Sequence, residues 1–423
     1  MGHLLMVESW VGSMSALLPR AIGEAGHRFT LLTRDLHHYL RAARPPEPHP
    51  LLAARNIITT ETNDTLALTE HVERLHAVLG FDGVISSCDY YLPTVARLSA
   101  RLGLPGPAPE AVEAACRKDL TRRILADAGV PGPRHAVCHD RAELLDAAAG
   151  MGFPLVLKPT DLCAGMYVRR VDDEDGLLAA HRELAGFPVN ARGQRRSPAV
   201  LLEELLTGPE VSVETVSGGG LHHVVGVTDK SVAGAPAFIE TGHMFPAASP
   251  PDVLREAVDT AVAALTALGL DEVVAHTEIR LTPGGPRVVE VNPRPAGNRI
   301  TELVRHVTGV DLPAAAVEVA MGRVPDLTPR DTGVGSAAIA FLLPERAGEL
   351  AGFDGTREAT GMPGVREIDL AAPGRRTRPA LSNNDYLGHV MVTSPDPGDA
   401  RPRAEKALSA LRPRWAEARE VLA

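Results

Sequence analysis

Cysteine, aromatic residues and long apolar runs are all scarce in this chain of 423 residues. It has four cysteines, and aromatic side chains make up 4% of it. The cysteines (Cys88, Cys116, Cys138 and Cys163) show no C-x-x-C spacing, which argues against a disulfide framework and predicts a reducing, cytoplasmic location. No apolar stretch reaches about 18 residues, so we expect no membrane span. The N-terminus also lacks the charged start and apolar run of a signal peptide.

A basic surface is missing as well. The net charge is −10 and the basic stretches are short, which excludes the general electrostatic footprint of a nucleic-acid-binding protein. We interpret one such stretch, residues 192–196, as a solvated loop. An acidic chain can still bind a nucleotide, because lysine, arginine, backbone N–H groups and metal ions hold phosphate locally.

The glycine pattern of a dinucleotide site is absent from the first strand-to-helix turn. Gly12 lies there, but no G-x-G-x-x-G does, so a nicotinamide oxidoreductase is poorly supported. Strands are nevertheless expected at residues 3–8, 28–33 and 82–87, and helices at 17–26 and 65–79. Alternation of this kind predicts a parallel, doubly wound sheet.

Proline-rich and polar segments divide the rest of the chain. Breaks fall near residues 105–109, 192–198 and 322–333. Between them we expect strands at 153–159 and 199–205, and hairpins around the turns at 217–220 and 283–286. This density of hairpins indicates an antiparallel sheet built around a ligand. A charged helix is expected near the end of the chain, at 401–421.

The second hairpin carries acidic side chains. Because alternate residues of a strand share a face, we expect two sets to point together: His276, Glu278 and Arg280, and Val288, Glu290 and Asn292. Pairing of the strands can then bring Glu278 close to Glu290 and Asn292. Two carboxylates and an amide oxygen suit Mg²⁺. Arg294 follows in the sequence NPRP, where a guanidinium can complement a phosphoryl group or an oxyanion.

Two lysines and an acidic linker precede this hairpin. Lys118 lies on an expected helix, and Lys158 ends an apolar strand, where it has to reach solvent or pair with an anion such as phosphate. In LLEELLTGPE, Glu203 and Glu204 end a strand and Glu210 follows a turn. Free backbone groups there can bind an adenine edge, and a nearby carboxylate can bind ribose hydroxyls. Taken singly, each of these residues also fits an exposed surface.

The order of these features resembles the ATP-grasp superfamily, over about residues 105–321. The motifs LLEELLTGPE and EVNPRP carry the likeness. Within the superfamily the chain looks most like the L-amino-acid ligases, through Asp229-Lys230, FIETGHMFP (238–246), HTEIRLTPGGPRVVEVNPRPAGNRI and TELVRHVTGVDL.

The resemblance implies an α/β and α+β multidomain fold. We expect a Rossmann-like pre-ATP-grasp domain at 1–112, a small ATP-grasp lobe at 113–198, a large lobe with the metal hairpin at 199–326, and an α+β extension at 327–423. Closure of the site implies that the small lobe, about residues 116–196, acts as a lid.

The resemblance also implies roles for individual residues. ATP would be bound by Lys118, Lys158, Glu203, Glu204, Leu206, Glu210 and Lys230. Two Mg²⁺ ions, for which Mn²⁺ could substitute, would be held by Glu278, Glu290 and Asn292. Arg294 would stabilise the acyl phosphate and the tetrahedral intermediate, while Glu240 and His243 would line the amino-acid pocket.

One segment departs from the superfamily pattern. The loop TDLCAGMYV (160–168), which should contact phosphate, has Gly165 as its only glycine, with Cys163 and Tyr167 in unusual places. The loop therefore differs from the Gly/Ser-rich phosphate flap of many ATP-grasp enzymes. A nucleophilic Cys163 is poorly supported, because no base is identifiable beside it.

The function implied is an ATP-dependent carboxylate–amine ligase. It would join an amino acid to an amine, such as a second amino acid, through an acyl phosphate and release ADP and phosphate. Two alternatives stay open: a carboxylase or purine-pathway type of enzyme that uses bicarbonate or a nucleotide-like acceptor, and a non-catalytic ATP-binding protein. We expect small-molecule partners and a homodimer. The sequence leaves open both substrates, and whether an α- or a side-chain carboxylate is activated.

Overall fold

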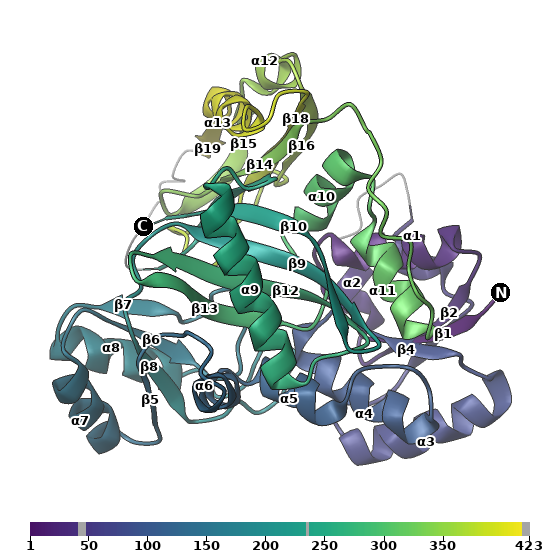
Figure 1. Ribbon diagram of the computed structural model, residues 1–423. Helices are drawn as coiled ribbons and strands as arrows, with labels where there is room; N and C mark the ends of the chain where they lie inside the picture. The colour runs from purple at the N-terminus through teal and green to yellow at the C-terminus, as the bar shows by residue number, and fades with distance from the viewer. Residues whose placement is uncertain (41–47, 234–236, 417–423) are drawn as a thin grey trace, which may run out of the picture.

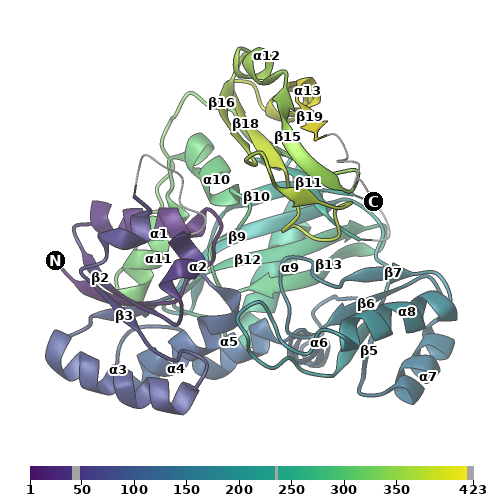
Figure 2. The ribbon, with the colours of Figure 1, turned by 180° about the vertical axis from the view of Figure 1, so that it is seen from behind.

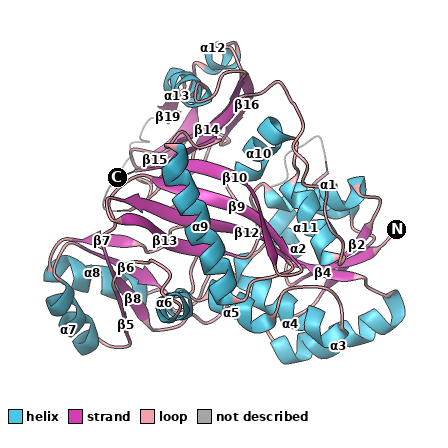
Figure 3. Cartoon of the chain, in the orientation of Figure 1, coloured by secondary structure: helices cyan, strands magenta, loops and turns pink. Residues whose placement is uncertain are grey.

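The computed structural model describes residues 1–40, 48–233 and 237–416, which form four β-sheets with helices packed against them (Figure 1). Figure 3 separates the elements by type and shows the long central strands crossed by a single helix. In the described part of the chain, no helix is both long enough and apolar enough to cross a lipid bilayer.

The N-terminal sheet is parallel, as predicted. It contains β1 (His3–Val7), β2 (Arg28–Thr33), β3 (Asn56–Thr59) and β4 (Gly83–Ile85) in the order β3-β2-β1-β4. Every residue of β1 is buried, as expected for a strand covered on both faces. The sheet is flanked by α1 (Met14–Glu24), α3 (Thr65–Leu79) and α4 (Leu92–Leu102). The Asp64 side chain accepts a bond from Ala67 N at the start of α3, and Gly80 ends the helix in the left-handed region.

A second, antiparallel sheet combines three strands of the predicted small lobe with β8 (Val200–Glu204), which lies just past the predicted boundary at residue 198. Its strands are β5 (His135–Cys138), β8, β6 (Leu155–Pro159) and β7 (Arg169–Val171), in that order. α7 (Arg141–Met151) and α8 (Glu174–Ala185) supply the apolar side chains that cover it. α6 (Lys118–Asp127) lies between this sheet and the central one (Figure 1).

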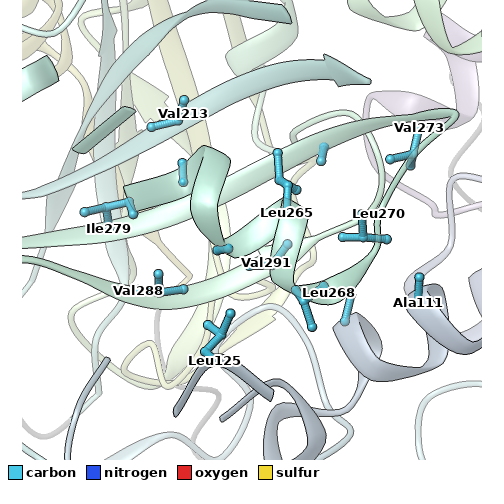
Figure 4. Close-up of a cluster of buried hydrophobic side chains, with 14 of the residues drawn as sticks. Ala111, Leu125, Val213, Leu265, Leu268, Leu270, Val273, Ile279, Val288 and Val291 are labelled. Atoms are coloured by element: carbon cyan, nitrogen blue, oxygen red, sulfur yellow. The ribbon is translucent and has the colours of Figure 1, made fainter. Parts of the chain in front are cut away.

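The central sheet has eight strands, in the order β13-β12-β9-β10-β11-β14-β18-β16. These are β13 (Gly285–Asn292), β12 (Val273–Thr282), β9 (Glu210–Gly218), β10 (Leu221–Val232), β11 (Glu240–Phe245), β14 (Ser336–Leu342), β18 (Gly388–Ser394) and β16 (Val365–Leu370). One face is covered by α9 (Pro251–Leu268), whose Leu265 and Leu268 pack with Val288 and Val291 of β13 (Figure 4). From behind, the other face is framed by the N-terminal domain, the small lobe and the C-terminal strands (Figure 2). Both predicted hairpins are present, and together with the parallel N-terminal sheet they confirm the predicted α/β and α+β fold class.

The fourth sheet has three strands, in the order β17-β15-β19, and the other elements connect the sheets. Its strands are β17 (Arg376–Thr377), β15 (Gly348–Asp354) and β19 (Arg412–Trp415). The connecting elements are α2 (Leu36–Leu40), η1 (Pro50–Ala53), η2 (Asp89–Tyr91), α5 (Pro109–Cys116), α10 (Ile300–Thr308), α11 (Leu312–Ala320), α12 (Thr356–Thr360) and α13 (Ala400–Ala410). α11 returns to the N-terminal sheet, where Val317 and Ala320 join its core. Gly83 of β4 is required there, because a Cβ at this position would lie 2.1 Å from Ala320 O.

The expected C-terminal helix is shorter than predicted. α13 ends at Ala410, and the chain continues as β19, which pairs with β15. Pro413 explains why the helix does not continue, because the proline ring disfavours the helical conformation of the residue before it. Residues 417–421 of the prediction lie outside the described residues. The domain boundaries at residues 112, 198 and 326 stay a prediction.

The interpretation of residues 192–196 as a solvated loop is wrong for its first arginine. Arg192 is 6% exposed, and its guanidinium donates a hydrogen bond to Ser9 O in the N-terminal domain. Its own carbonyl accepts bonds from Arg34 Nη2, at 2.6 Å, and from Asn63 Nδ2, at 2.9 Å. We call this set of contacts the Arg192 clasp. It ties the small lobe to the N-terminal domain, a long-range use that a short basic run does not reveal.

Candidate active site

A cavity of about 770 Å³ lies where the N-terminal domain, the small lobe and the central sheet meet. It is lined by most of the predicted site residues: Lys118, Lys158, Glu203, Glu204, Leu206, Glu210, Glu240, Glu278, Glu290, Asn292 and Arg294. Lys230 and His243 are the predicted residues that do not line it. The structure therefore gathers side chains that are far apart in the sequence around one space.

The metal hairpin has the register that the prediction requires. Glu278 of β12 is directly opposite Glu290 of β13, and His276 is opposite Asn292. The expectation that Val288 shares their face is wrong. The register shifts between Glu278 and Ile279, so that an extra residue, Val289, is accommodated in β13. This bulge turns Val288 into the core under α9 and leaves Glu290 on the cavity side.

Lys230 lies beneath the carboxylates of the cavity. Its Nζ is 2.5 Å from Glu278, 3.0 Å from Glu240 and 3.1 Å from Glu210. Burial alone would lower the pKa of Lys230, but the three carboxylates outweigh it and hold the pKa well above its usual value. The ammonium therefore neutralises and orders the acidic side chains that face the cavity. Its contact with ATP stays a prediction.

The other two lysines are also held by glutamates. Lys118 Nζ is 2.9 Å from Glu290 and donates to Leu162 O at 2.6 Å. Lys158 Nζ is 2.6 Å from Glu203. Each lysine is 8% exposed, so the alternative of ordinary surface lysines is excluded. Both ammonium groups remain at the cavity wall, where an incoming phosphate would meet them.

Glu203 forms ion pairs with two cationic side chains. In addition to Lys158 it binds Arg122 Nε at 2.6 Å, and Arg122 Nη2 donates to Val289 O in the metal hairpin. Burial would raise the pKa of Glu203, but Arg122 and Lys158 lower it to about 2. The sequence did not single out Arg122. Arg122 lies one helical turn after Lys118, so the sequence already placed it on the same face of the helix as a predicted ATP-binding residue.

The remaining linker residues lie along the same wall. Glu204 pairs with Arg134 Nε at 3.0 Å. Glu210 is 2.5 Å from Arg280 Nη2 and also contacts Lys230. Leu206 lines the cavity between them in sequence, after β8 has ended, so its backbone is outside the strand ladder.

Glu240 and His243 contact each other, although residues three apart in a regular strand face opposite ways. The register of β10 with β11 shifts after Ser231, which turns both side chains to the side of Lys230. His243 Nε2 then lies 3.2 Å from Glu240. Glu240 also accepts a hydrogen bond from Asn298 Nδ2. His243 is 1% exposed and packs edge-on against Phe341, so it supports the pocket from behind and does not line it.

Arg294 is anchored by a residue that the sequence analysis missed. Its Nε donates to Asp89 Oδ1 at 2.7 Å, and Asp89 belongs to η2 of the N-terminal domain. Burial would lower the pKa of Arg294, but Asp89 raises it above the usual value. A signal was available, because Asp89 follows the predicted strand 82–87 and ligands of open α/β sheets bind at the carboxyl ends of strands.

The sequence analysis also missed Glu214, the β9 partner of His276. His276 Nδ1 is 3.0 Å from Glu214, and its Nε2 is 3.2 Å from Glu278. Burial would lower the pKa of His276, but Glu214 and Glu278 raise it to about 9. The imidazolium thus bridges β9 and the carboxylate that faces the cavity.

Cys163 lies in the cavity wall, but its chemistry is that of a buried thiol. Burial raises the pKa of Cys163 well above its usual value. The neutral thiol is a poor nucleophile, which agrees with the interpretation made from the sequence.

The donor set fits a hard divalent cation. Glu278, Glu290 and Asn292 offer oxygen ligands from two paired strands to one cavity. Burial would raise the pKa of Glu278, but Lys230 and His276 lower it, so the carboxylate is ionised as a metal ligand must be. Mg²⁺ therefore fits these residues.

Comparison with known proteins identifies the domains. The ATP-grasp N-terminal domain matches residues 21–106, the ATP-grasp domain residues 151–302, and the L-amino acid ligase C-terminal domain 2 residues 340–416. The crystal structure of an L-amino acid ligase from Bacillus licheniformis superposes with a TM-score of 0.81 at 22% identity, covering 99% of both chains. That likeness shows a shared fold.

Two sequence relatives extend the comparison. Uncharacterized protein y4rH of Sinorhizobium fredii is 30% identical, over 88% of this chain and 79% of that protein. Carnosine synthase 1 of Homo sapiens is 29% identical, over 77% of this chain but 41% of that protein, so this chain spans less than half of it. Together the matches show that the chain belongs to the ATP-grasp superfamily.

Proposed function

We propose that this protein activates the carboxylate of an amino acid with ATP and joins it to the amine of a second amino acid. The carboxylate oxygen attacks the γ-phosphorus, which gives an acyl phosphate and ADP. The amine then attacks the acyl carbon, loses a proton and expels inorganic phosphate. The observation that carries the proposal is the paired register of Glu278 and Glu290 beside Arg294 in one cavity.

The charges of the cavity suit the first step. Lys118 and Lys158 reach the wall from the small lobe, where they can bind phosphate oxygens. Glu278, Glu290 and Asn292 would hold Mg²⁺, two ions in our proposal, and Mn²⁺ has a similar oxygen preference. Bound metal would neutralise phosphate charge and help to align the transfer.

The second step needs a group that stabilises an oxyanion. The guanidinium of Arg294 lies in the cavity and keeps its charge, so it can serve both the acyl phosphate and the tetrahedral intermediate. The polar end of the cavity near Glu240, Asn298 and Tyr386 would then receive the amino-acid substrate. The L-amino acid ligase C-terminal domain supports this choice of substrate, because Tyr386 lies within it.

The metal assignment has its own test. We expect Glu290→Gln to raise the Mg²⁺ concentration for half-maximal turnover by about tenfold or more, since an amide is a weaker ligand than a carboxylate. The exposed Glu24, on α1, provides the control Glu24→Gln. Matching metal titrations in wild type and Glu290→Gln would mean that the metal binds elsewhere.

The function is tested by phosphate release with purified protein, Mg-ATP and pairs of amino acids, and by mass spectrometry of the product. We expect phosphate and ADP in equal amounts, with a product that weighs one water less than its two substrates together. ATP cleavage stimulated by bicarbonate without any amino acid would instead support a carboxylase. ATP binding with no turnover across the full set of pairs would contradict the ligase proposal.

A further inference from the structure

Asp89 occupies a special position in the N-terminal sheet. In the order β3-β2-β1-β4, the chain fills one side of β1 first and then crosses to the other side as β4. In open α/β sheets, the crevice at the carboxyl ends of strands beside such a reversal is where ligands bind. The segments that follow β1 and β4 line the cavity here, the first with residues 10–16 and the second with Ser87 and Asp89.

The backbone around Asp89 is firmly held. Cys88 N donates to Ser86 Oγ at 3.1 Å, and Tyr91 N donates to Cys88 O at 2.9 Å. Tyr91 is 1% exposed, and its hydroxyl donates to Asn63 Oδ1 at 2.8 Å. The backbone that carries the Asp89 carboxylate is therefore rigid. A residue that orients another side chain requires such a rigid backbone.

The partner of Asp89 is Arg294, 205 residues later in the chain. Asp89 takes the Nε–H, while Nη1 donates to Pro295 O at 3.1 Å and Nη2 reaches Asn292 Oδ1 at 3.5 Å. A guanidinium has five N–H donors, so these contacts fix its plane and leave donors for a substrate oxygen. Both side chains of the pair are 16% exposed, so the ion pair is largely shielded from water.

We propose that Asp89 is a positioning residue of the ligase reaction, which sets the guanidinium of Arg294 in the orientation that binds the acyl phosphate and its oxyanion. The proposal rests on the function proposed above. It makes the N-terminal domain a working part of the active site, because that domain supplies the carboxylate that holds the Nε–H of Arg294.

The physical argument is one of preorganisation. An arginine side chain has many rotamers, and ordering it during the reaction would cost conformational entropy. The ion pair with Asp89 orders the Arg294 side chain when the protein folds, before substrate binds. Small misplacements of a catalytic group can lower turnover by about a hundredfold, so the effect should appear in kcat and leave the KM for ATP nearly unchanged.

The experiment compares two replacements of Asp89 in the full-length protein. Asp89→Asn keeps an oxygen that can accept the Nε–H bond, and we expect its kcat to fall by less than about fivefold. Asp89→Ala removes the acceptor, and we expect a fall of about 10- to 100-fold. Asp127 is exposed on α6 and does not line the cavity, so Asp127→Ala is the matched control. Thermal unfolding checks each variant, and Asp89→Ser replaces Asp89→Ala if the latter does not fold.

A double-mutant cycle with Arg294→Ala separates positioning from an independent role. If Asp89 acts through Arg294, adding Asp89→Ala to Arg294→Ala should lower kcat by less than about twofold. Equal fold-losses in both backgrounds would overturn the proposal, and so would an Asn variant as slow as the Ala variant, because the carboxylate would then act on the substrate itself. A wild-type protein that forms no product would contradict the proposed function instead, so the two failures are distinguishable.

Discussion

The guanidinium of Arg294 is the side chain that tests the chemistry most directly. Because it is the cationic group placed beside Asn292 at the cavity wall, we expect Arg294→Ala to lower kcat by about 10²- to 10³-fold. ATP binding should change little, since Lys118 and Lys158 remain. Phosphate release at saturating substrates and calorimetric ATP titration measure the two effects. Arg123, exposed on α6, gives the control Arg123→Ala; turnover within twofold of wild type in Arg294→Ala would exclude this role.

The buried triad of Glu203 with Lys158 and Arg122 should make stability depend on pH in acid. The pKa of Glu203 is about 2 in the folded protein, against an ordinary value of 4.5. A lowered folded-state pKa contributes stability that is fully present above about pH 4.5 and is lost as pH falls towards 2.

Glu203→Gln isolates this contribution. At pH 7 the variant should unfold more easily by roughly 3–5 kcal/mol, because it leaves two buried cations without their carboxylate. The difference from wild type should shrink as pH falls below about 4.5. Urea unfolding at several pH values measures it, with exposed Glu24→Gln as a comparison. If the difference in unfolding free energy between wild type and Glu203→Gln stayed constant with pH, the claim that Arg122 and Lys158 lower the pKa of Glu203 would be wrong.

At the scale of elements, the linker turn between β8 and β9 depends on Gly208. Its φ is +122°, and a Cβ there would lie 2.0 Å from Leu281 O of β12. We expect Gly208→Ala to destabilise the fold by about 1–3 kcal/mol and to raise the KM for ATP, because the turn carries Leu206 and Glu210.

Gly150 is the matched position for that test. It lies inside α7, where an added Cβ would meet no neighbouring side chain or strand within 4 Å, so Gly150→Ala should be neutral or stabilise by about 0.5–1 kcal/mol. Thermal unfolding and ATP titration compare the two variants. Equal behaviour of the two alanine variants would contradict the close-approach argument.

Turn residues and strand alternation were enough to predict part of the fold from the sequence, and they failed where a strand contains a bulge. The hairpin at 283–286 follows from its Gly and Pro residues, and alternation correctly paired Glu278 with Glu290. The same alternation failed at Val288, which lies beside a bulge. A second bulge, in the pairing of β10 with β11, brings Glu240 and His243 to one side. A bulge depends on the neighbouring strand, so a period-two pattern in one strand does not contain it.

Long-range contacts account for the part of the site that was not predicted. Asp89 and Arg294 are 205 residues apart, and Arg122 reaches Val289 across 167 residues. Neither pair has a local spacing that marks it. Such contacts depend on how the sheets are assembled, which hydrophobic pattern and turn chemistry alone do not specify.

At the scale of the whole molecule, the Arg192 clasp bears on the proposed lid. Movement of the small lobe relative to the N-terminal domain has to separate Arg192 from Ser9, Arg34 and Asn63. We expect Arg192→Ala to increase backbone hydrogen exchange around residues 190–196 and to raise the KM for ATP through a less restrained lobe.

The neighbouring Arg195 is exposed and provides the control Arg195→Ala. Hydrogen exchange measured by mass spectrometry, with and without ATP, reports on both variants. Unchanged exchange in Arg192→Ala would mean that the hydrogen bond from the Arg192 guanidinium to Ser9 O does not restrain the lobe. The expected homodimer also belongs to this scale and stays a prediction, which light scattering of the purified protein measures.

The return of α11 to the first sheet has a consequence for how the chain is made. Val317 and Ala320 complete an apolar core whose other members come from the first 85 residues. On a ribosome those early residues emerge well before α11 does, so the nascent N-terminal domain must keep an uncovered apolar patch until about residue 320 has been synthesised. Its folding is therefore completed late, and until then the uncovered patch is open to aggregation or to capture by a chaperone.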